Sequence, residues 1–126
     1  MNDAKIQLSE EELHLALNAG WILTKNRIVE KICRYFGDLA NCYRQYSGDV
    51  FSFLPVMQSP KIAKGEHYNG LPYVMLDYPR YFTQTDILAV RTMFWWGNDM
   101  SITLHLKGKY KEKFALAVTE ALAGGG

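Results

Sequence analysis

The side chains that could carry chemistry are densest between Gly65 and Tyr81, in the stretch GEHYNGLPYVMLDYPRY. A histidine, an aspartate and an arginine in this stretch offer a base, an acid and a clamp for an anion, and the tyrosines can stack on a ligand. Arg91 and His105 add two such groups further along the chain. The candidate ligand-binding residues are therefore His67, Tyr73, Asp77, Tyr78, Arg80, Arg91 and His105.

The same residues also have a purely structural interpretation. Tyrosines near strand ends usually pack their rings and hydrogen-bond locally. Asp77 directly precedes Tyr78-Pro79, where a carboxylate commonly sets a turn. A histidine on a polar strand face, such as His105, is commonly solvated. The stretch therefore nominates a place for a ligand without naming a reaction.

No sequence motif identifies a reaction or a cofactor. His14, His67 and His105 are far apart in the chain, and the metal-site spacings HExxH and CxxC do not occur. The nucleophile motif GxSxG and the phosphate-binding P-loop are missing as well. We therefore expect neither a metal nor a cofactor, and the sequence leans against an enzyme.

Length and charge predict one globular domain. The chain has 126 residues, of which 48% are hydrophobic, and a formal net charge of +1. This length suits one core, so we expect a single domain over 1–126 with flexible ends at 1–8 and 124–126. The near-neutral charge argues against nucleic-acid binding. No run of about 18 apolar residues and no secretory signal occur, so the expected location is the cytoplasm, away from membranes.

Two helices are expected in the first third of the chain. Ser9 and Glu12 have the spacing of a capping box, which predicts a first helix over about 10–18. A second helix is predicted from 21 or 24 to 45, because apolar residues recur there every three or four positions. Its apolar face comprises Ile28, Ile32, Tyr35, Phe36, Leu39 and Tyr43.

Three or four antiparallel strands should follow. The stretch LPYVMLDYP predicts a strand from Tyr73 to Asp77 that Pro79 ends. The turn signal Asn69-Gly70 would join it to a short strand over 61–64. Before that strand, the segment VFSFLPVM (50–57) is apolar enough to pack on the core. A final helix over 109–123 should cover the sheet.

The last two strands, 89–96 and 100–107, should form a hairpin around Gly97, Asn98 and Asp99. In the second of them, alternate residues are apolar, and this side is expected to face the core. Its members are Met100, Ile102, Leu104 and Leu106.

The length of the hairpin loop decides which side chains share a face. Two-residue turns place Trp95 and Met93, with Arg91, on the core side, and place Phe94 and Trp96 beside Thr103 and His105. A three-residue loop would add a bulge and reverse this assignment. With the two-residue turn, the candidate interface residues are Phe94, Trp96 and Thr103.

The sequence thus predicts an α+β fold with two N-terminal helices, an antiparallel sheet of three or four strands with a Gly-Asn-Asp hairpin, and a C-terminal helix packed on the sheet. The first functional hypothesis is a non-catalytic binding or assembly domain. It would self-associate through the aromatic sheet face, as a homo-oligomer or with a protein partner. The alternative is a small enzyme or ligand-binding protein that holds a small molecule between segment 65–81 and hairpin 89–107.

Overall fold

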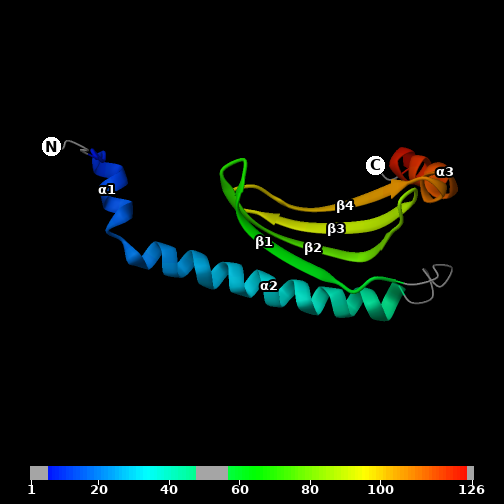
Figure 1. Cartoon of the computed structure of the whole chain (residues 1–126), viewed down its shortest axis with the longest axis horizontal. Helices are drawn as coiled ribbons and strands as arrows, with labels where there is room; N and C mark the ends of the chain where they lie inside the picture. The colour runs from blue at the N-terminus through cyan, green and yellow to red at the C-terminus, as the bar shows by residue number, and fades with distance from the viewer. Residues whose placement is uncertain (1–5, 48–56, 125–126) are drawn as a thin grey trace. The chain divides into compact units, whose positions relative to one another are not determined.

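The computed structural model describes residues 6–47 and 57–124. Two helices come first, a four-stranded antiparallel sheet follows, and a third helix ends the chain (Figure 1). This arrangement confirms the predicted α+β class. Segment 50–57, which we expected to pack on the core, lies outside the described residues apart from Met57. The elements are α1 (Glu10–Ala16), α2 (Ala19–Ser47), β1 (Lys61–Tyr68), β2 (Leu71–Phe82), β3 (Ile87–Trp95), β4 (Met100–Lys107) and α3 (Lys109–Gly124).

The chain divides into two compact units, Met1–Lys31 and Ile32–Gly126, with the boundary inside α2. Whether they make up the single domain expected from the chain length stays a prediction. In the first unit, the predicted capping box of α1 is confirmed. The Glu12 amide donates to Ser9 Oγ at 3.0 Å, and the Ser9 amide donates to Glu12 Oε1 at 2.8 Å.

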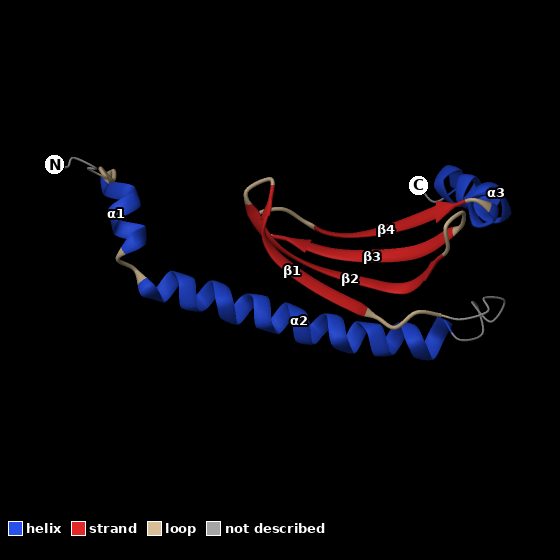
Figure 2. Ribbon diagram, viewed as in Figure 1, coloured by secondary structure: helices blue, strands red, loops and turns tan. Residues whose placement is uncertain are grey.

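The four strands lie side by side in the order of the sequence, β1-β2-β3-β4 (Figure 2). Asn69 and Gly70 form a two-residue turn between the paired residues Tyr68 and Leu71. Both turn residues have positive φ, 52° and 82°, as the tight turn between twisted strands requires. The short strand expected over 61–64 exists and extends to Tyr68.

The predicted end of the strand at Pro79 is wrong, because β2 continues to Phe82. Pairing with β1 stops at Asp77, and the register with β3 shifts between Asp77 and Arg80. Pro79 therefore lies in a bulge, where the ladder requires no N–H donor from it.

The predicted facing of the last hairpin is also wrong. Phe94 pairs with Met100, which leaves five residues between the last paired positions instead of two. An odd number reverses the faces, the outcome expected for a bulged loop. The longer loop is held against β2, because the Trp96 amide donates to Pro72 O at 2.9 Å. Within the loop, the Asn98 amide donates to Trp95 O at 2.9 Å.

The register defines two sheet faces, named here the core face and the polar face. The core face carries Val74, Leu76, Leu88, Val90, Thr92, Phe94, Met100, Ile102, Leu104 and Leu106. The polar face carries Tyr73, Met75, Asp77, Arg91, Met93, Trp95, Ser101, Thr103 and His105.

The second half of α2 covers the core face over β2 and β3. Phe36 and Ala40 are buried, and Tyr43 Oη, from the same side of the helix, lies 3.5 Å from Thr92 Oγ1. Leu76 and Thr92 beneath are at most 1% exposed. Tyr35, which we expected on the apolar face of this helix, is instead 52% exposed, because it points about 100° away from Phe36 around the helix axis.

The helix α3 covers one end of the same face, as predicted. Tyr110 is buried with Leu88, and these two form a cluster with partly buried apolar neighbours. The neighbours are Met57, Tyr81, Leu106 and Phe114.

Most of the core face of β4 is exposed, apart from Leu106 at the end near α3. Met100 is 46% exposed, Ile102 68% and Leu104 48%. We call these three residues the β4 apolar strip. The expectation that they fill the core is wrong, because β4 is an edge strand and Tyr43 of α2 contacts Thr92 on the neighbouring strand β3. Among the described residues, neither α2 nor α3 therefore buries these three side chains of β4.

Asp86 anchors the start of α3 by accepting a hydrogen bond from the Lys109 amide at 2.8 Å. This bond, assisted by Thr85 and by the charge of Lys109, lowers the pKa of Asp86 below its ordinary value of 3.8. Since the folded-state pKa lies below the unfolded one, the anchor stabilises the fold above pH 3.8 and is lost as the pH falls through the folded-state pKa.

We therefore expect the Lys109 amide resonance to titrate with a midpoint below pH 3.8, as followed by NMR. Asp86→Asn is the matched control, because its amide oxygen can still accept the bond but carries no charge to titrate. The same titration in the Asn variant would contradict the assignment to Asp86.

Candidate functional site

Two of the candidate ligand-binding residues meet on the polar face as an ion pair. Asp77 and Arg91 are direct partners across β2 and β3. Arg91 Nε donates to Asp77 Oδ1 at 2.8 Å, and its Nη2 donates to Oδ2 at 3.0 Å. The hydrogen bonds to Asp77 raise the pKa of the Arg91 guanidinium above its ordinary value. In this bidentate geometry the two groups bind each other, which leaves fewer of their hydrogen-bonding atoms for a third molecule.

An aromatic cluster lies on the same sheet beside this pair. The ring of Tyr68 meets Trp95 edge to face, with centroids 5.0 Å apart, and meets Tyr73 at 6.0 Å. The Trp95 indole N–H donates to Tyr68 O at 2.9 Å. Gly65 makes room for the cluster, since a Cβ there would come within 2.6 Å of the Tyr73 ring carbon Cζ. The aromatic rings and the ion pair together form a platform on the polar face.

The other four candidate ligand-binding residues do not join this platform. Tyr78 is buried, and the guanidinium of Arg44 lies 5.9 Å from its ring centroid. Arg80 Nε donates to Ser59 O at 2.7 Å. His67 is exposed near the β1–β2 turn, and His105 is exposed opposite Ala89.

The candidate list from the sequence omits Tyr68, although it is one of the tyrosines considered for stacking, and it omits Trp95. The signal that could have found Tyr68 is Gly65, because a glycine inside a strand marks a close approach of another group. Trp95 was assigned to the core, and only the register of the last hairpin moves it to the polar face.

The three candidate interface residues are divided between different surfaces. Phe94 and Trp96 contact each other edge to face, with centroids 6.3 Å apart and both rings half-buried. Phe94 lies on the core face, next to Met100. Thr103 is exposed on the polar face, opposite Arg91. The β4 apolar strip, with Phe94 at its end, therefore forms an exposed apolar surface on the core face.

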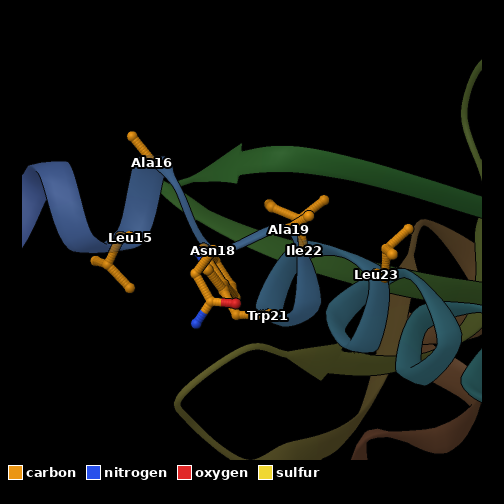
Figure 3. A pocket seen from close by; sticks show the side chains of 7 residues that line it. All are labelled: Leu15, Ala16, Asn18, Ala19, Trp21, Ile22 and Leu23. Carbon is orange, nitrogen blue, oxygen red and sulfur yellow. The ribbon is translucent and has the colours of Figure 1, made fainter.

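A hollow of about 460 Å³ lies at the junction of α1 and α2 in the first unit (Figure 3). In Figure 3 the side chains of Leu15 and Leu23 extend to opposite sides of the chain, so the lining does not converge on one centre. Asn18 is its one polar residue, which leaves it no acid, base or metal ligand. The lining residues are Leu15, Ala16, Asn18, Ala19, Trp21, Ile22 and Leu23.

Within residues 6–47 and 57–124, no three His, Cys, Asp or Glu side chains gather closely enough to hold a metal ion. The cysteines Cys33 and Cys42 are both free. No helix in the described part of the chain is long and apolar enough to cross a bilayer.

Comparisons with known proteins do not assign a family. Neither a protein-family model nor a curated protein nor a solved structure matches the chain.

Proposed function

We propose that this chain is a non-catalytic assembly domain that associates with itself through its sheet. One observation carries the proposal: the β4 apolar strip, whose three side chains are 46–68% exposed on the same face that α2 and α3 cover elsewhere. Contiguous apolar surface of this kind usually marks a contact with another protein. In this proposal the partner is a second copy in the cytoplasm, and neither a membrane nor a nucleic acid takes part.

Because Phe94 lies on the core face, the proposed contact surface differs from the one suggested by the sequence. The sequence suggested an aromatic contact made by Phe94, Trp96 and Thr103 on one face. Since Phe94 shares its face with Met100 and not with Thr103, the proposed contact is aliphatic at its centre and aromatic only at its end.

The test is sedimentation of the wild-type chain and of Ile102→Asp over a range of concentrations. Burying an isoleucine side chain contributes about 1.5–3 kcal/mol, so we expect the variant to raise the dimer Kd roughly ten- to a hundredfold. Ile62→Asp is the matched control, because it makes the same substitution at a 40% exposed isoleucine on the opposite edge strand, β1. A wild-type chain that stays monomeric at high concentration would refute the proposal.

A second candidate function is ligand binding on the polar face, by a small enzyme or carrier. It is supported by the adjacency of the Asp77–Arg91 pair and the rings of Tyr68, Tyr73 and Trp95. The pair is already satisfied internally, with bonds of 2.8 and 3.0 Å, which makes this the weaker candidate. Association through β4 would leave this face open, so the two functions do not exclude each other.

A further inference from the structure

The strand β4 ends the sheet with an unprotected edge. On one side it pairs with β3 without any register shift, and within the described ranges no strand pairs with its other side. Natural edge strands usually carry a lysine, a proline or a bulge that prevents pairing with another chain. From Met100 to Leu106, β4 has none of these, and its one lysine, Lys107, is the last residue of the strand. Its outer backbone groups are therefore available to a further strand.

The sequence of this strand is complementary to itself. The stretch DMSITLHLK, from Asp99 to Lys107, can pair antiparallel with a second copy about a twofold axis at Thr103. Apolar side chains then face apolar ones, polar side chains face polar ones, and an acid faces a base at both ends. The opposed residues are Asp99 and Lys107, Met100 and Leu106, Ser101 and His105, Ile102 and Leu104, and Thr103 and itself.

Neighbouring registers lack this charge complementarity. A twofold axis at Ile102 or at Leu104 still sets apolar residues against apolar ones, but it separates Asp99 from Lys107. A shift by a single residue in the pairing would set apolar side chains against polar ones along the whole strand. Among these registers, the axis at Thr103 alone satisfies both the faces and the charges.

We infer that two copies of this chain pair β4 with β4 about a twofold axis at Thr103, which joins two four-stranded sheets into one. The inference rests on the proposed function, because it gives the partner and the geometry of the same strip. In this arrangement Ile102 and Leu104 of one copy lie beside Leu104 and Ile102 of the second, so the two β4 apolar strips become one continuous surface. The symmetric contact closes with two copies and leaves no free edge on β4.

Disulfide trapping tests the register directly. In a Cys33→Ser/Cys42→Ser background, Thr103→Cys should form a covalent dimer rapidly on mild oxidation. Directly opposed residues of antiparallel strands have Cα atoms about 4.5–5.5 Å apart, within disulfide range. Ser101→Cys is the matched control on the same strand and face. Its counterpart in the second copy would lie four residues along the strand, roughly 13 Å away, and should cross-link at a small fraction of the rate.

An exchange of charges tests the ends of the pairing. Asp99→Lys gives a chain with two lysines, and Lys107→Asp gives a chain with two aspartates. Each variant should dimerise roughly tenfold more weakly than wild type at low ionic strength, while an equimolar mixture of the two should regain wild-type affinity as a heterodimer. Circular dichroism spectra that match wild type establish that each exposed-site variant is folded.

The outcomes separate this inference from the proposed function. Fast trapping at position 103 with recovery in the mixture supports the pairing. A wild-type dimer that Ile102→Asp disrupts, but that traps positions 101 and 103 equally, overturns the strand pairing and leaves the assembly function standing. A wild-type monomer overturns both.

Discussion

Replacing Leu76 with alanine is expected to destabilise the fold by about 2–5 kcal/mol. Leu76 is fully buried on the core face of the central strand β2, where it pairs with Thr92 of β3. Its removal leaves a cavity below the second half of α2, which can close only in part. Urea unfolding followed by circular dichroism, at one fixed protein concentration, measures the free energy of unfolding.

Ile62→Ala is the matched control for Leu76→Ala. Ile62 lies directly opposite Leu76, on the edge strand β1, and is 40% exposed. Because the side chain already contacts water, its loss should cost well under half as much. Equal losses at the two positions would mean that the core does not lie over β2 and β3.

Replacing Gly108 with alanine is expected to cost about 2–5 kcal/mol, for two separate reasons. Gly108 has a φ of +67°, which costs a residue with a Cβ about 1–2 kcal/mol. An added Cβ would also collide with the Thr85 carbonyl oxygen and with Asp86 Oδ1. Relieving such an overlap costs about 1–3 kcal/mol more. The same urea unfolding experiment measures the loss.

Gly70→Ala separates the two costs at Gly108. Gly70 also has a positive φ of +82°, but an added Cβ there meets no atom within 4 Å. We expect Gly70→Ala to show the backbone cost alone, about 1–2 kcal/mol. The displaced Asp86 should also free the Lys109 amide in Gly108→Ala and not in Gly70→Ala, which NMR can detect. A Gly108 variant no less stable than the Gly70 variant would contradict the close approach of Asp86.

Sequence patterns predicted the structure correctly where it depends only on residues that are close in the chain. The capping box at Ser9 and Glu12 satisfies backbone donors within four residues, so its position marks the start of α1 without reference to the rest of the chain. Asn69-Gly70 likewise allows both turn residues to adopt positive φ, and this sets the pairing of β1 with β2. Both features could be read from the printed sequence.

The last hairpin could not be assigned from local signals, because its turn residues permit several loop lengths. Gly97 and Asn98 suit loops of different length. Adding or removing one loop residue turns every side chain of β3 to the other face of the sheet. The choice depends on β2, a strand distant in sequence, whose Pro72 carbonyl binds the Trp96 amide. The positions of Trp95 and Phe94 followed from that contact.

In the candidate site, the sequence likewise named residues by their chemistry but could not place them relative to one another. Asp77 and Arg91 were both named from their chemistry, but their pairing depends on the register of two strands. Tyr78 has the same side-chain chemistry as Tyr73, yet it is buried, because the alternation along β2 turns it away from the polar face.

The sequence by itself determined the helices, the number and order of the strands to within one, and the alternation that gives β4 an apolar side. These features arise from contacts between near neighbours and from the periods of helix and strand. Only the tertiary structure decided which residues of β3 share that apolar side and that α2 leaves it uncovered. Both depend on contacts between distant segments, which no local pattern records. The apolar side of β4, which the sequence assigned to the core, is in the fold the surface for which a partner is proposed.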